Sequence, residues 1–168
     1  MAYGKKSSGG SGAFQKFKGD LSAGTLSGAY IFYGEESYLR EYYLEALRKK
    51  LIPAGVEDFN YHRVEGKDVN VQTLAEMAEA MPMMAERTLL VAVDFDIFKL
   101  NEEQRDKLIA LLEDIPPYCC VVFAYDTVEY KPNKTMKKLC KAIDSHVETV
   151  EFRPASGSDL EAWIARRF

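Results

Sequence analysis

The sequence has no long apolar run, only two histidines and only three cysteines. No segment approaches the roughly 18 apolar residues that a membrane-spanning helix requires, and the first residues lack the apolar core of a secretory signal peptide. His62 and His146 have no ligand spacing, and Cys119, Cys120 and Cys140 have no zinc-type spacing. We therefore expect no metal site, no membrane partner, and a cytoplasmic protein whose thiols are reduced and partly buried.

Catalytic side-chain sets and a strong net charge are also missing. No Ser/His/Asp or Cys/His combination can be assembled from the sequence spacing, and a net charge of −4 gives the whole chain no nucleic-acid signature. The remaining composition is ordinary, because 168 residues, 47% of them apolar and 29% charged, suit one globular domain with an adequate core.

Short β-rich runs alternate with segments of helical periodicity. After an amphipathic segment at 14–26, we expect strands at 29–33, 59–64, 88–93, 119–124 and 147–152. The expected helices are 36–51, 70–80, one from Asn101 to the prolines at 116–117, and 133–143. This alternation predicts a three-layer α/β fold, in which a parallel sheet has helices on both faces.

The chain is expected to have three regions. Residues 1–13 are rich in glycine and serine and predict a flexible tail. Residues 14–155 would form the α/β domain. Residues 156–168 would begin a second, helical domain, because the amphipathic pattern at 160–168 has no remaining partner to cover its apolar side. We therefore expect a fragment of a longer protein.

The first expected strand ends at Gly34, where a nucleotide-binding P-loop would begin. Counted along the motif G-x-x-x-x-G-K-[ST], the second glycine is Leu39, the lysine is Arg40 and the Ser/Thr is Glu41. Acidic residues at 35–36 add negative charge at the helix N-terminus, where phosphates would bind. The sequence thus predicts a P-loop NTPase-type architecture with a degenerate P-loop, no nucleotide cofactor and a non-catalytic role in an ATP-driven machine.

Two acids follow the third expected strand. Asp94 and Asp96 would lie at the carboxyl edge of the sheet, where a magnesium-binding acid of an ATPase belongs. The glutamate that usually accompanies that acid is replaced by Phe95. A vestigial metal site and a solvated loop are both open, and the second interpretation is preferred.

Met83 and Met84 follow Pro82 in a connecting segment. Two adjacent large apolar side chains in a loop cannot both face inward easily. One interpretation packs them under the edge of the sheet. The other makes them an exposed apolar plug for a protein partner, for which flexible methionine is well suited.

The segment around the fourth expected helix is basic. Its lysines predict either the solvated face of an amphipathic helix or a patch near a nucleic-acid backbone or an acidic subunit. They are Lys131, Lys134, Lys137, Lys138 and Lys141.

Several short segments follow one another in a distinctive order along the chain. The first are a strand and turn at 30–39, followed by Phe59-Asn60 with Gly66. The most telling segment is 80–91, with a proline, two large apolar residues, and an arginine that leads into a strand. The segments 111–117, 137–141 and 160–168 come next. In this order and spacing, the segments resemble the delta subunit of the bacterial DNA polymerase III clamp loader, and the resemblance covers about 21–168.

The resemblance implies an AAA+-like domain that holds no nucleotide, in a subunit without catalysis of its own within a nucleotidyltransferase complex. It implies binding to the sliding clamp (the beta subunit) and help in opening that ring for loading onto primed DNA. Met83 and Met84, after Pro82, would insert into a pocket on the clamp, although the usual pair is leucine and phenylalanine. ATPase and delta-prime type subunits would be further partners. The family's ATPase subunit has an intact P-loop and a four-cysteine zinc module, and neither occurs here.

Two other functions remain open. A divergent P-loop nucleotide kinase or NTPase would use Arg40 in place of lysine. A flavodoxin-like signalling domain would present Asp94 at its acidic edge.

Overall fold

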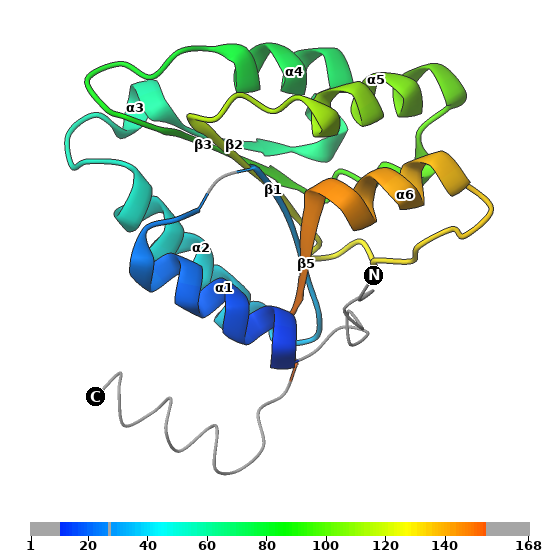
Figure 1. Ribbon diagram of the computed structural model, residues 1–168, viewed down its shortest axis with the longest axis horizontal. Helices are drawn as coiled ribbons and strands as arrows, with labels where there is room; N and C mark the ends of the chain where they lie inside the picture. The colour runs from blue at the N-terminus through cyan, green and yellow to red at the C-terminus, as the bar shows by residue number, and fades with distance from the viewer. Residues whose placement is uncertain (1–10, 27, 154–168) are drawn as a thin grey trace.

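The computed structural model describes residues 11–26 and 28–153, and its five strands form one parallel sheet. The strands are β1 (Gly28–Tyr33), β2 (Tyr61–Glu65), β3 (Thr88–Val93), β4 (Cys119–Ala124) and β5 (Val147–Glu151). Their order across the sheet is β2-β3-β4-β1-β5 (Figure 1). Strands β3, β4 and β1 therefore have a neighbour on both sides, and β2 and β5 form the edges. The predicted parallel sheet is confirmed.

Helices cover both faces of the sheet (Figure 1). They are α1 (Ser11–Ala23), α2 (Ser37–Leu51), α3 (Glu57–Asn60), α4 (Val71–Glu79), α5 (Glu102–Glu113) and α6 (Lys137–His146), with short 3-10 turns η1 (Gly66–Asp68) and η2 (Ile97–Lys99). One apolar cluster joins the sheet to α1 and α2, and a second joins it to α4, α5 and α6. The three-layer α/β prediction is therefore correct.

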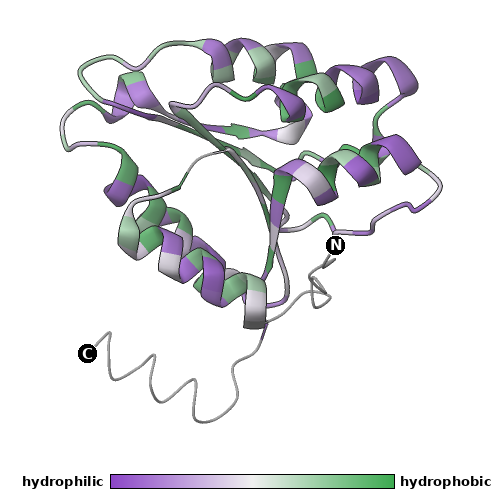
Figure 2. Ribbon diagram, in the orientation of Figure 1, coloured by the Kyte–Doolittle hydropathy of each residue, from purple (hydrophilic) through white to green (hydrophobic). Residues whose placement is uncertain are grey.

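Alternation along the strands divides the core between these two clusters. Successive strand residues point to opposite faces, so Ile31 packs toward α4, α5 and α6 while Phe32 packs toward α1 and α2. Cys119 and Cys120 divide in the same way, and both thiols are free and buried. Figure 2 shows that the central strands are mainly apolar and that the helices around them carry both apolar and polar residues.

Several element boundaries differ from the prediction, and two of the differences have clear structural causes. Residues 59–60, expected in a strand, lie in α3, and β2 begins only at Tyr61. Helix α6 begins at Lys137 rather than at 133, because the Asn133 side chain accepts hydrogen bonds from the backbone N–H and hydroxyl of Thr135 and holds a turn there. Helix α5 begins after Asn101 as expected, and Asn101 caps it, since Asn101 Oδ1 accepts a hydrogen bond from Gln104 N–H.

The predicted ends of the chain are covered only in part. Helix α1 begins at Ser11, inside the segment 1–13 that was expected to be a tail. Residues 1–10 and the expected start of a second domain at 156–168 lie outside the described residues. In the part of the chain that is described, no helix is both long enough and apolar enough to cross a membrane.

Candidate functional site

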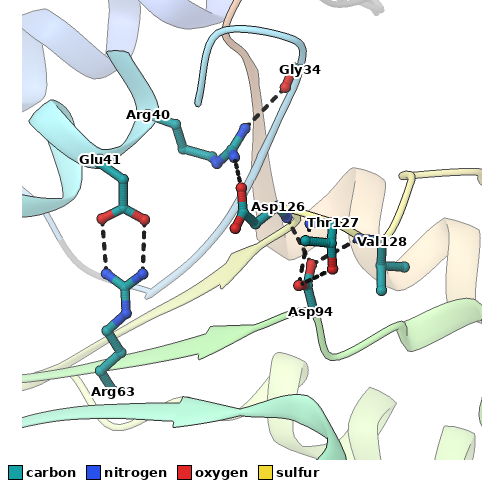
Figure 3. A network of polar contacts seen from close by, with 8 residues as sticks. All are labelled: Gly34, Arg40, Glu41, Arg63, Asp94, Asp126, Thr127 and Val128. Atoms are coloured by element: carbon teal, nitrogen blue, oxygen red, sulfur yellow. Dashed lines mark hydrogen bonds and ion pairs between the residues drawn. The ribbon is translucent and has the colours of Figure 1, made fainter. Parts of the chain in front are cut away.

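The carboxyl edge of the sheet brings together the residues that would form a nucleotide site. Parallel strands end at the same edge, and β3, β4 and β1 are neighbours. Gly34 follows β1, Asp94 follows β3 and Asp126 lies two residues beyond β4. Figure 3 shows these groups joined in a network of polar contacts that includes Arg40.

Gly34 is required by the chain that leaves β5, rather than by a phosphate. Its φ is +123°, and a Cβ added there would lie 2.3 Å from the carbonyl oxygen of Phe152. The same segment donates a 2.7 Å hydrogen bond from Phe152 N–H to the Tyr33 carbonyl. It also accepts one of 3.1 Å from Glu36 N–H. The close backbone approach explains the glycine.

Arg40, at the P-loop lysine position, is only 1% exposed and is paired within the protein. Its Nη1 donates a 2.9 Å hydrogen bond to the Gly34 carbonyl, and its Nη2 donates one of 2.6 Å to Asp126 Oδ1. Its Nε is buried without a hydrogen-bond partner. The positive charge that a P-loop directs at phosphates is thus held by a carbonyl and a carboxylate of the chain itself.

The other two P-loop positions also have structural roles. Leu39 packs against the cluster under α1 and α2. Glu41 accepts hydrogen bonds of 3.0 and 2.8 Å from the two terminal nitrogens of Arg63 on β2 (Figure 3). The hydrogen bonds from Arg63 hold the pKa of Glu41 below its usual value. This ion pair joins α2 to the edge strand β2. At the position where a P-loop has the hydroxyl that binds magnesium, this chain has a carboxylate paired with an arginine.

Asp94 is neither a plain solvated acid nor part of a ligand cluster. Its φ is +55°, and its carboxylate accepts hydrogen bonds from the backbone N–H groups of Asp126 (2.8 Å), Thr127 (3.2 Å) and Val128 (3.1 Å). The Thr127 hydroxyl donates another of 2.7 Å. Burial alone would raise the pKa of Asp94, but these hydrogen bonds outweigh it and lower the pKa.

Asp96 has a separate local role. Its Oδ1 accepts a hydrogen bond from Phe98 N–H and caps η2. Among the described residues, no group of three or more His, Cys, Asp or Glu side chains could hold a metal ion. Asp94 and Asp96 therefore hold loops, and Asp94 together with Arg40 fixes the segment that follows β4.

A second candidate site is the connection from α4 to β3, residues 80–87, which we call the methionine loop. Met81, Met83 and Met84 are 74%, 56% and 84% exposed, and Pro82 is half-buried. The interpretation that packed Met83 and Met84 under the sheet is therefore wrong. The sequence had also given no role to Met81, which lies two residues before Met83 and is exposed as well.

The backbone of the methionine loop is held at its start, middle and end. The Tyr118 hydroxyl donates a 2.5 Å hydrogen bond to the Glu79 carbonyl, and Thr88 N–H donates one of 2.9 Å to the Tyr118 carbonyl. In the middle, the Asn60 side chain exchanges two hydrogen bonds with the backbone of Met83. Exposed side chains thus lie on a fixed main chain.

Sequence reasoning did not predict that α3 adds an exposed apolar side chain beside the methionine loop. Six large apolar side chains are exposed in the described residues, and four of them are Phe59, Met81, Met83 and Met84, on α3 or in the methionine loop. Figure 1 shows α3 beside the connection from α4 to β3. The sequence pattern assigned residues 59–60 to a strand, so the short helix was not predicted. No local pattern indicates that Asn60 contacts a residue 23 positions away.

The basic segment around α6 fits a solvated face. Leu139, Ala142 and Ile143 are buried, whereas the lysines are exposed. Lys131 forms a 3.3 Å ion pair with Glu129. The exposed lysines are Lys131, Lys134, Lys137, Lys138 and Lys141.

Solved structures share this fold. A Bacillus subtilis DNA clamp loader delta protein matches with a TM-score of 0.69 and 23% identity, covering 90% of this chain and 45% of that one. A DNA polymerase III gamma subunit-related protein from Thermotoga maritima matches with a TM-score of 0.56 and 17% identity, covering 87% and 47%. A Thermotoga maritima RuvB matches with a TM-score of 0.53 and 16% identity, covering 92% and 47%. The AAA+-like fold is therefore confirmed.

Sequence comparison assigns the family. The chain is 25% identical over 146 residues to the DNA polymerase III subunit delta of Bacillus subtilis (strain 168), covering 83% of this chain and 41% of that protein. It thus spans about two fifths of the length of that relative. The family described as "DNA polymerase III, delta subunit" matches residues 30–153, which hold both the altered P-loop and the methionine loop, and the chain belongs to this family.

Proposed function

We propose that this chain is the clamp-binding part of a clamp-loader delta subunit and that it docks on the sliding clamp through Met83 and Met84. The observation that carries the proposal is the exposure of both side chains on a loop whose backbone is hydrogen-bonded in place. Interfaces of this kind derive most of their affinity from a few anchored side chains. Methionine, being flexible and polarisable, suits an apolar pocket on the partner.

Docking would act on the clamp through differential affinity. If the methionine pair binds the clamp more tightly when one ring interface is open than when it is closed, docking shifts the population of clamps toward the open ring. The subunit would thereby help to open the clamp for loading onto primed DNA. In the assembled loader, located in the cytoplasm, ATPase subunits and a delta-prime type subunit would control access to the methionine loop.

The altered P-loop supports a subunit without nucleotide chemistry. The kinase or NTPase alternative needs Arg40 free to contact phosphate, but its guanidinium is paired with Gly34 and Asp126. The signalling alternative needs an available carboxylate at Asp94, and that carboxylate accepts four hydrogen bonds from the segment that follows β4. Both sites are occupied by the chain's own groups.

Titration of the chain against a purified sliding clamp tests the proposal. The parent should bind saturably, and the variant with both Met83→Ala and Met84→Ala should not bind at micromolar concentrations. Circular dichroism should show that this variant is folded, because exposed loop side chains contribute little to stability. Tyr38→Ala is the matched control, because it removes an exposed large side chain from α2. A folded double variant that binds like the parent would refute the proposal.

A further inference from the structure

We propose that Asn60 is a positioning residue that fixes the main chain of the methionine loop in its docking conformation before a clamp is bound. This inference rests on the proposed clamp-binding function. It assigns no contact with the clamp to Asn60 itself, because the side chain is 0% exposed.

Both polar atoms of the Asn60 side-chain amide form hydrogen bonds with backbone groups. Its Nδ2 donates hydrogen bonds of 2.7 Å to the Met83 carbonyl and 2.9 Å to the Val56 carbonyl. Its Oδ1 accepts a hydrogen bond of 2.7 Å from Met83 N–H. The side chain therefore pairs with Met83 as a neighbouring strand would, through one donor and one acceptor. An asparagine amide has both groups in one plane, which makes this reciprocal pairing possible.

The conformation that Asn60 holds is one that the loop would not adopt reliably alone. Met84 has a φ of +57°, in the left-handed region that residues with a Cβ rarely occupy. Met83 and Met84 are both exposed, so their own packing gives the backbone little support. Strained backbone persists where surrounding contacts determine it, and the Asn60 amide supplies two such contacts at the preceding residue.

Asn60 holds the methionine loop in a fixed position relative to the sheet. It is the last residue of α3 and directly precedes β2, which pairs in parallel with β3. Its third hydrogen bond, to Val56, holds its side chain against the start of α3. The methionine pair is thereby fixed relative to the edge of the sheet. A loop ordered in advance loses less conformational entropy on docking than a mobile one.

The test uses Asn60→Ala, with Asn101→Ala as the matched control. Asn101 caps α5 through one side-chain hydrogen bond, so its replacement removes the same chemical group from an element outside α3 and the methionine loop. We expect Asn60→Ala to weaken clamp binding about tenfold, with Asn101→Ala close to the parent. We also expect faster amide hydrogen exchange at Met83 in Asn60→Ala, relative to Leu90 in β3, and no such change in Asn101→Ala.

A second variant covers the case in which Asn60→Ala does not fold. Asn60→Asp keeps the size of the side chain and an acceptor for Met83 N–H, but it lacks the amide NH₂ group and so cannot donate to both the Met83 and the Val56 carbonyls. It should also weaken binding and expose the Met83 amide to exchange. Circular dichroism and urea denaturation would show that the variants compared are folded.

The outcomes separate this inference from the proposed function. If the Met83→Ala, Met84→Ala variant loses binding while a folded Asn60 variant keeps the parent affinity, the positioning role is overturned and the docking proposal stands. Equal weakening by Asn60→Ala and Asn101→Ala would also overturn it, since general destabilisation would then explain the loss. If removal of both methionines leaves binding unchanged, the docking proposal fails and this inference fails with it.

Discussion

Arg40 and Asp126, 86 residues apart in the chain, are joined by a 2.6 Å hydrogen bond between a guanidinium nitrogen and a carboxylate oxygen. The same guanidinium donates to the Gly34 carbonyl, so one side chain links the end of β1, the start of α2 and the segment after β4. A charge-assisted bond of this kind is stronger than a neutral one. A residue that would contact phosphate in an ATPase is here part of the fold.

Arg40→Ala should therefore lower the free energy of unfolding. Breaking a fully buried ion pair costs about 3–5 kcal/mol, and an exposed pair contributes about 0–1 kcal/mol. We expect about 2 kcal/mol here, between these limits, because Arg40 is buried but the Asp126 carboxylate is 44% exposed and can be hydrated when its partner is lost. Urea denaturation followed by circular dichroism measures the loss. A change well below about 1 kcal/mol would show that the pair contributes little.

Mg-ATP should not bind usefully to the parent chain. Calorimetric titration should show no saturable binding up to about 1 mM ligand, equivalent to about −4 kcal/mol. The variant Arg40→Lys should not restore binding, because Leu39 and Glu41 still occupy the glycine and hydroxyl positions. Micromolar binding that Arg40→Ala abolished would instead support a nucleotide kinase or NTPase.

Gly34→Ala should destabilise the fold by about 2 kcal/mol or more, because the new Cβ would meet backbone and the φ value is unfavourable for alanine. Gly19→Ala is the matched control, since Gly19 lies in α1 and an added Cβ has no heavy atom within 4 Å. That variant should gain about 0.5–1 kcal/mol through helix propensity. Thermal or urea unfolding would compare them, and similar effects of both substitutions would contradict the close approach of Phe152.

The lowered pKa of Asp94 predicts a loss of stability in acid. A carboxylate with a lower pKa in the folded state stabilises the fold above its unfolded pKa of about 4. That contribution is lost as the pH falls through the folded pKa. The free energy of unfolding should decline more steeply below about pH 4 in the parent than in Asp94→Asn, which cannot ionise. Stability should still decline with falling pH in both proteins, because the pKa of Glu41 is also lowered in the folded state. Identical slopes in urea denaturation at a series of pH values would contradict the assignment.

The sequence predicted the sheet well because its signals are local. The β-rich runs that became β3 and β4 have continuous apolar character, and both strands are buried along their whole length. The degenerate P-loop could also be found, because it follows from a fixed spacing after Gly34. These features need no knowledge of distant contacts.

The missed features depend on contacts between distant segments. Arg40 was considered as a substitute for lysine, and only the fold brings Asp126 to it. Asp94 was expected in a solvated loop, but the segment after β4 bonds to its carboxylate. Asn60 was assigned to a strand, and its amide instead pairs with Met83. Periodicity describes which face a residue occupies, but it does not identify a hydrogen-bond partner.

Salt dependence should distinguish the methionine loop from the lysines of α6 as the clamp contact. Apolar docking is weakly screened, so clamp affinity should change less than about threefold between about 50 and about 500 mM salt. Lys138→Glu with Lys141→Glu should leave the affinity unchanged, because these exposed residues lie on α6, across the sheet order from α3 and the methionine loop. Met83→Ala and Met84→Ala should each cost about 2 kcal/mol or more in binding free energy. Surface plasmon resonance at several salt concentrations measures all of these. A steep loss of affinity with salt, together with loss in the glutamate variant, would assign the contact to α6 instead.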